Sequence, residues 1–174
     1  MLSKKKQKEY LKAVGCADVK SFQKKYMRAK DVDGKYGTNT DKALQSVYNV
    51  LTYGDGYFKP EDFRCKCGGK YCTGYPAIID VQLIKNLAYL RKDSGKPITI
   101  SSGLRCKKWN AKQSGSASKS RHMSGKAADI ISSVLTNTKD ARNKLIKRWY
   151  SFKKANYAYG NTSNMGKAVH VDVK

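Results

Sequence analysis

The sequence predicts an α+β protein in which a small three-helix domain precedes a larger domain built on an antiparallel sheet flanked by helices. Apolar residues recur every three or four positions through the first fifty residues, whereas "PITISS" and "AVHVDV" alternate with a period of two. Between them, "TYGDGYFKP" interrupts any periodicity with two glycines and a proline. We therefore place a domain boundary near residue 55, giving domains 1–54 and 55–174.

Three helices are expected before this boundary. Residues 3–14 and 19–27 each carry an apolar stripe, and Asp18 is the expected N-cap of the second. The third follows the polar stretch "DVDGKYGTNT", with Thr38 to Thr40 available as caps. Its expected apolar face consists of Ala43, Leu44, Val47 and Leu51.

The second domain alternates helical and extended patterns. A helix is expected over residues 79–90, ending at "DSGKP", and a strand over 98–100. After a Gly/Ser-rich loop at 112–120, "AADII" predicts a strand, residues 138–152 a helix and "AVHVDV" a final strand.

The composition is strongly basic. There are 36 Lys and Arg against 13 Asp and Glu, a net charge of +23, which predicts attraction to polyanions such as nucleic acid, anionic membranes or wall polymers. Lysines outnumber arginines about fourfold, which favours diffuse attraction over the bidentate phosphate and base contacts of specific nucleic-acid readers. Neither a membrane span nor a secretion signal is apparent.

The chain has only two histidines, His122 and His170, and acidic residues lie close to both. Of the three carboxylates after Asp93, Asp129 and Asp172 are close to these histidines in sequence. Catalytic zinc sites use three His or carboxylate ligands and leave one position open. Local structural roles for all of these residues remain the alternative.

Several short motifs follow one another in an order that is typical of a known enzyme family. "CKCGGKYC", "SGLR", "SRHMSGKAADI", and "YAYG" before "AVHVDV" resemble the zinc D-Ala-D-Ala metallopeptidase family, which is related to lysostaphin-type peptidases and the hedgehog amino domain. The resemblance spans residues 60–173 and is greatest to the subgroup of phage endolysins and bacterial wall hydrolases. Residues 19–50 resemble the small peptidoglycan-binding domain, with "FQ", "DGKYG" and a helix that begins with Thr and Ala.

The family resemblance implies site residues and a reaction. His122, Asp129 and His170 would hold Zn²⁺, and Arg105 would hold a substrate carboxylate or steady the oxyanion. Zinc would activate a water for attack on a peptide bond. Where relatives often carry His or an acidic base, this chain has Ala168 and Lys167.

The sequence therefore does not determine which residue acts as the general base. Asp172 is the nearest candidate, on the same strand face as His170. The competing interpretations are that Asp172 orients His170, or that Glu61 or Asp62 reaches the site from the other side. A ligand set of His122, Asp129 and Asp172, with His170 as base, is a further alternative.

Five cysteines, an odd number, require at least one unpaired thiol. Cys65, Cys67, Cys72 and Cys106 are expected to form a closed zinc site, disulfides or buried thiols. Cys16 is expected to be a free core thiol.

Together these features predict an endolysin-type D,D-peptidase, an endopeptidase or carboxypeptidase, that cuts a peptide bond in the stem or cross-link of peptidoglycan. Its partners are peptidoglycan and anionic wall polymers, and a monomer is expected. It would wait in the host cytoplasm until a holin opens the membrane, or act outside the cell. The alternatives are an inactive wall-binding module and a basic nucleic-acid-binding protein.

Overall fold

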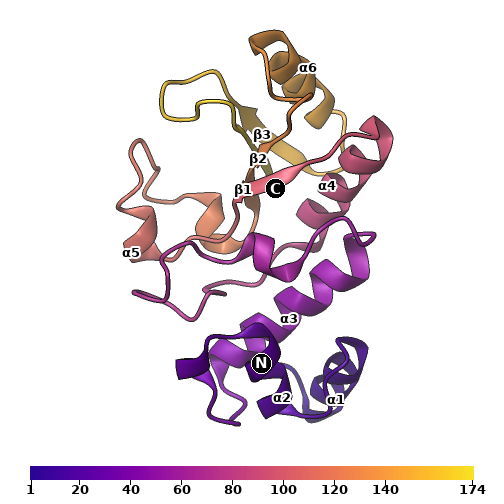
Figure 1. The fold of residues 1–174 in the computed structure, drawn as a ribbon, viewed down its shortest axis with the longest axis vertical. Coiled ribbons are helices and arrows are strands. Elements are labelled where there is room, and N and C mark those ends of the chain that lie inside the picture. The colour runs from indigo at the N-terminus through magenta and orange to yellow at the C-terminus, as the bar shows by residue number, and fades with distance from the viewer.

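The chain begins with helices and ends in a sheet, as the change of hydrophobic period predicts. In the computed structural model, which describes residues 1–174, the α-helices are α1 (Lys4–Ala13), α2 (Val19–Tyr26), α3 (Thr38–Tyr53), α4 (Val81–Ser94), α5 (Lys107–Asn110) and α6 (Lys139–Trp149). The strands are β1 (Thr99–Ser102), β2 (Ala127–Ile131), β3 (Ala155–Tyr159) and β4 (Val169–Val173). Short 3-10 turns are η1 (Ala29–Asp31), η2 (Pro60–Phe63) and η3 (Arg121–Ser124). The predicted α+β class is confirmed (Figure 1).

The three N-terminal helices form where the sequence predicts them. Asp18 caps α2 by accepting a hydrogen bond from the backbone N–H of Ser21 at 2.7 Å. The prediction for the start of α3 was wrong, because its N-cap is Gly37 and no side chain caps it. Thr40 instead accepts a hydrogen bond from Gln23 of α2 at 3.0 Å. Leu51 was also misplaced, since it is 46% exposed while Val50 beside it is buried.

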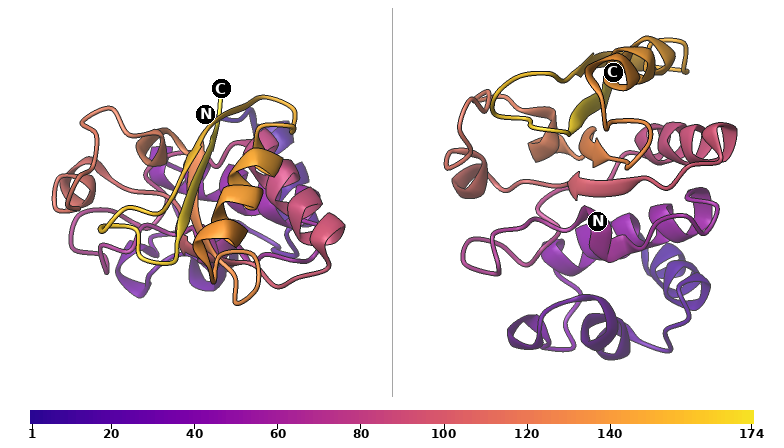
Figure 2. Two further views of the ribbon diagram at one scale, coloured as in Figure 1. Left: turned by 90° about the horizontal axis from the view of Figure 1, so that it is seen from above. Right: turned by 45° about the horizontal axis from the view of Figure 1, so that its top comes forward.

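The sheet is antiparallel throughout, in the order β1-β2-β4-β3. Helices α4 and α6 cover one face of it, and long loops lie on the other side (Figure 2). On β4 the three valines pack into the core, and the alternating positions His170 and Asp172 therefore belong to the opposite face. The strand β3 was not predicted, and α6 ends at Trp149 rather than at 152.

One core of 33 buried residues runs through both halves of the chain. Helix α3 packs on α4, and Asn49 donates a hydrogen bond to the carbonyl of Ile79 at 2.9 Å. Ile79 is buried as predicted but lies just before the helix it was assigned to, whose N-cap is Asp80. Division into domains 1–54 and 55–174 stays a prediction. None of the helices has the length and apolar character needed to cross a bilayer.

Candidate metal centre

The sheet register assembles a row of polar side chains, one from each strand. Asp129 of β2 pairs with His170 of β4, and on either side Ser102 of β1 pairs with Asp129 and Tyr159 of β3 pairs with His170. Directly paired residues of antiparallel strands point to the same face. The row therefore lies on the sheet face that α4 and α6 leave uncovered, and the Tyr159 ring stacks on His170 with centroids 4.8 Å apart.

His122 reaches this row from η3, which two glycines hold in place. Gly125 ends η3 at a φ of 76°, and a Cβ there would meet the carbonyl oxygen of Ile78 at 2.0 Å. Gly103 lies against Phe63, whose backbone a Cβ would meet at 2.6 Å. The carbonyl of Gly103 lies 2.7 Å from Nδ1 of His122. Both glycines belong to the motifs "SGLR" and "SRHMSGKAADI".

Three potential metal ligands converge in this arrangement. Nε2 of His122 lies 3.2 Å from Oδ1 of Asp129 and 3.2 Å from Nδ1 of His170, and the latter two atoms are 2.9 Å apart. Zn–N and Zn–O bonds of about 2.0–2.1 Å in a tetrahedron place neighbouring ligand atoms about 3.3 Å apart. The donor set and its spacing therefore fit one tetrahedral face around a zinc ion.

The far nitrogen of each imidazole has an acceptor of its own. Nδ1–H of His122 donates to the Gly103 carbonyl, and Nε2–H of His170 donates to Oδ2 of Asp172 at 3.3 Å. With these tautomers, the remaining lone pair of each ring faces Asp129. This is how metal-binding histidines are commonly oriented in proteins.

Burial and charge set the protonation of the three residues. Burial lowers the pKa of His122, which favours the neutral ring that a metal ligand requires. Burial opposes ionisation of Asp129, but hydrogen bonds and charges from both histidines outweigh it and lower the pKa of that carboxyl. Burial likewise opposes a charge on His170, yet Asp129 and Asp172 raise its pKa overall. A cation between the rings would therefore compete with a proton on His170.

Arg105 contacts the outer side of this cluster. Its Nε donates to Oγ of Ser102 at 2.9 Å, and its Nη2 pairs with Oδ2 of Asp129, leaving Oδ1 toward the histidines. The guanidinium thus fixes the Asp129 carboxylate. Arg105 also borders the open space above the cluster, where the predicted contact with a substrate carboxylate remains a prediction.

The cluster opens into a cleft of about 1050 Å³. The loops 113–121 and 162–168 contribute much of its wall, and Arg105, Lys119 and Arg121 make its border basic. Tyr157, 53% exposed, lies at the same cleft. A tetrahedral ion held by three residues would have its fourth position available to water or substrate.

The remaining acidic candidates for general base or metal ligand, Asp172, Glu61 and Asp62, differ in their positions relative to the cluster. Oδ1 of Asp172 accepts hydrogen bonds from Asn156 at 2.8 Å and from the backbone N–H of Tyr157 at 2.9 Å, so both carboxylate oxygens have partners. Asp172 lies on the far side of the His170 ring from Asp129, which disfavours the ligand set that includes it. Glu61 and Asp62 do not line the cleft.

Sequence reasoning missed three contributors to the site. Ser102, Tyr159 and the carbonyl of Gly103 all contact the metal-ligand candidates or Arg105. All three lie within the motifs "SGLR" and "YAYG", but the motifs alone assign no contact to these positions. The signal was present, but only strand pairing reveals what each residue touches.

The comparison with protein families agrees with this geometry. The family model for Peptidase M15 matches residues 56–172, about two thirds of the chain and all the residues of the cluster. No curated protein and no solved structure matches the chain significantly. The match ends at β4, which carries His170 and Asp172, and begins just after α3. The chain belongs to the Peptidase M15 family of zinc metallopeptidases, which act on peptidoglycan-like substrates.

Proposed function

We propose that the protein is a D,D-peptidase of endolysin type that hydrolyses a peptide bond in the stem or cross-link of bacterial peptidoglycan. The convergence of His122, Asp129 and His170 at the floor of an open cleft carries this proposal. A buried carboxylate between two imidazoles would be a costly arrangement if it only filled space. Family membership supplies the general substrate class.

In this proposal His122, Asp129 and His170 hold one zinc ion. Zinc, when bound, supplies the Lewis acidity that polarises a scissile carbonyl and lowers the pKa of a coordinated water. Gly103 and Asp172 hold the two imidazole rings through their outer nitrogens. These contacts fix the donor atoms before substrate arrives, which preorganises the site.

The contacts of Asp172 favour a positioning role over that of general base. One oxygen faces His170, and the other is held by Asn156 and the Tyr157 backbone. Asp172 as the base remains a prediction, because a carboxylate can still take a proton while it accepts hydrogen bonds. Glu61 and Asp62 have little support from their position outside the cleft.

The basic cleft border suits the substrate class. Stem peptides carry free carboxylates, and Arg105, Lys119 and Arg121 border the space in which a peptide would lie. In the proposal Arg105 serves twice, fixing Asp129 and offering its cleft side to a substrate carboxylate or oxyanion. Endopeptidase and carboxypeptidase reactions both fit this cleft.

The helices α1 to α3 serve in the proposal as a wall-binding unit. Their match to the "FQ" and "DGKYG" pattern supports this role. Gln23 of that pattern is buried, donates a hydrogen bond to the Asp33 carboxylate and accepts one from the backbone N–H of Gly34. The net charge of +23 adds attraction to anionic wall polymers. We further propose that a monomer reaches the wall from the host cytoplasm after holin action, or from outside the cell.

One observation favours a second candidate, an inactive wall-binding module of the same fold. Positions 167 and 168, where relatives often carry an acid or a histidine, are Lys167 and Ala168. No further carboxylate lines the cleft besides Asp129 and Asp172. Bond cleavage is therefore the property that distinguishes the two candidates.

The test is mass spectrometry of purified peptidoglycan after incubation with the protein. We expect new peptide ends that disappear on chelation and with Asp129→Asn. Asp93→Asn is the matched control, because Asp93 is an exposed carboxylate paired with Arg148 far from the cluster. Its products should equal those of the unaltered protein. An undigested wall that still binds the protein would instead support the inactive module.

A further inference from the structure

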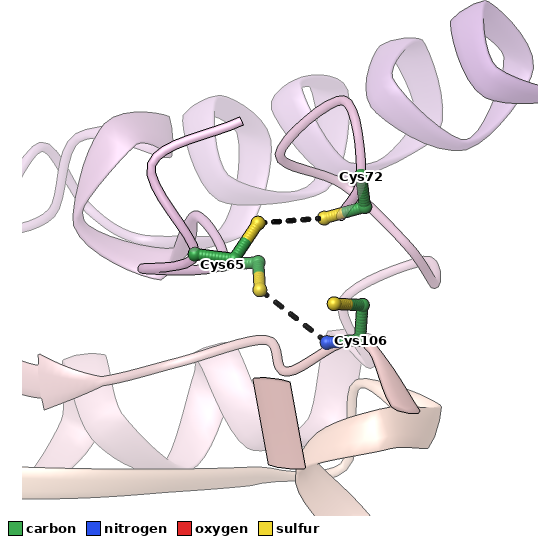
Figure 3. Close-up of side chains that lie close together, drawn as sticks. Cys65, Cys72 and Cys106 are labelled. Atoms are coloured by element: carbon green, nitrogen blue, oxygen red, sulfur yellow. Dashed lines mark hydrogen bonds between the residues drawn. The ribbon is translucent and has the colours of Figure 1, made fainter. Parts of the chain in front are cut away.

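A second group of potential metal ligands lies outside the cleft. It consists of Cys65, Cys67, Cys72 and Cys106, none of which lines the cleft, and all four are free thiols. Their sulfur atoms all lie within 4.8 Å of one another. Figure 3 shows the side chains of Cys65, Cys72 and Cys106 gathered around one point, with Cys65 opposite the other two. Residues 41 positions apart thus meet at one point.

The spacing of the sulfurs fits a tetrahedral ion. Zn–S bonds of about 2.3 Å place neighbouring sulfurs of a tetrahedron about 3.8 Å apart. Sγ of Cys67 and Sγ of Cys72 are 3.6 Å apart. Cys65, Cys67 and Cys106 are buried and Cys72 is half-buried, so the group is closed to solvent on most sides. Four ligands and closure distinguish structural zinc sites from catalytic ones.

The backbone around the thiols is shaped for such a site. Gly68 and Gly69, with φ of 64° and 87°, turn the chain between Cys67 and Cys72. The backbone N–H of Cys106 donates to Sγ of Cys65 at 3.3 Å. A hydrogen bond of this kind stabilises negative charge on the sulfur, as metal-bound thiolates require.

The charges nearby also suit a tetrathiolate. Replacing four thiol protons by one Zn²⁺ leaves the site with a charge of two minus. Lys66, Lys70, Lys107 and Lys108 flank the cysteines in sequence, and residues 63–79 contain no Asp or Glu. A dianionic centre is favourable in these surroundings.

We propose that Cys65, Cys67, Cys72 and Cys106 bind a structural zinc ion, separate from the ion of the cleft, that joins the loop after η2 to the start of α5. The proposal needs no oxidant, in contrast to disulfides between the same residues. It also employs all four thiols of the cluster and leaves only Cys16 unpaired.

The site would support both neighbouring parts of the molecule. Cys106 directly follows Arg105, which fixes Asp129, and the N–H of Leu104 donates to the Phe63 carbonyl at 2.8 Å. On the other side, Arg28 donates to the carbonyl of Cys72, and Lys30 to that of Gly69 at 2.7 Å. The ion would therefore hold the cleft wall and the surface on which the N-terminal helices dock.

Zinc content of the purified chain tests the proposal. We expect two zinc ions per unaltered chain and one in each of His170→Ala and Cys65→Ser. The matched control is Cys16→Ser, which removes a buried free thiol outside the cluster and should keep both ions. Zinc that is lost completely with His170→Ala would overturn the proposal, as would an unchanged count in Cys65→Ser.

A second measurement covers the case in which Cys65→Ser does not fold. His170→Ala, with the cleft site disabled, is loaded with Co²⁺, and the near-ultraviolet absorption is recorded. Strong thiolate-to-cobalt charge-transfer absorption supports the four-cysteine site, and its absence overturns it. Intact-mass measurement of the chain purified without reductant provides a separate check. A mass lowered by the hydrogens lost in disulfide formation would also overturn it.

Discussion

The two clusters of potential metal ligands are built on different kinds of backbone. His170 and Asp129 are paired residues of adjacent strands, and the ring of His122 is fixed by a backbone carbonyl. The four cysteines lie on loops and at the start of a short helix, where no strand pairing sets their positions. The first cluster opens on a cleft and the second is enclosed. A paired sheet can hold ligands at an open cleft by its own hydrogen bonds, whereas the loops of the second cluster would gain rigidity from the proposed ion.

The largest effect is expected from removing a ligand of the open cluster. His170→Ala should reduce hydrolysis of peptidoglycan to the level of the chelated protein, because two donors cannot hold the ion in place. The sheet should survive, since the valines of β4 bury its other face. Circular dichroism and a digest read by mass spectrometry check both points. A variant that still cuts in a chelation-sensitive way contradicts the ligand assignment.

The close approach of Gly103 to Phe63 should make Gly103→Ala strongly destabilising. A Cβ would lie 2.6 Å from the Phe63 backbone, so β1 or the loop after η2 must shift. We expect a loss of about 3 kcal/mol in the free energy of unfolding, measured with urea. Gly37→Ala is the control, because nothing lies within 4 Å of its added Cβ, and should cost less than about 1 kcal/mol. Equal losses would show that the contact with Phe63 is not tight.

Replacing Asp172 distinguishes two roles for this residue, namely orienting His170 and acting as the general base. If it orients His170, Asp172→Asn should lower activity or zinc affinity by about 10–100-fold and leave the shape of the pH–rate profile unchanged. An asparagine has a single acceptor oxygen, so it can keep the hydrogen bonds from Asn156 and Tyr157 or the one from His170, but not both sets. Loss of the acidic limb of the profile, with zinc fully retained, would instead identify Asp172 as the general base.

The smallest effect is expected at Tyr159, whose ring stacks on His170. Tyr159→Phe keeps the ring and removes only the hydroxyl, so activity should change by less than about threefold, within about 0.7 kcal/mol. Steady-state hydrolysis of a stem-peptide substrate measures it. A loss of activity of a hundredfold or more would instead indicate that the Tyr159 hydroxyl contacts the substrate.

Much of the molecule follows from local patterns in the chain. Asp18 as the cap of α2, the helical stripes of α1 to α4 and the alternation of β4 are all visible without a structure, because each depends on neighbours within a few residues. Leu51 and the cap of α3 were predicted wrongly. Tertiary packing decided which side of α3 was buried there, and periodicity cannot settle such a choice between adjacent residues.

By itself, the sequence determined which residues are available for the candidate site. Two histidines, few late carboxylates and a set of ordered motifs restrict the candidates to His122, Asp129, His170 and Asp172, and the family resemblance favours the first three as ligands. Only the tertiary structure decided how they meet. The pairing of Asp129 with His170, the Gly103 carbonyl behind His122 and the approach of Cys106 to Cys65 join residues far apart in the chain. Such contacts depend on strand register and on the closure of long loops, for which a linear pattern carries no local signal.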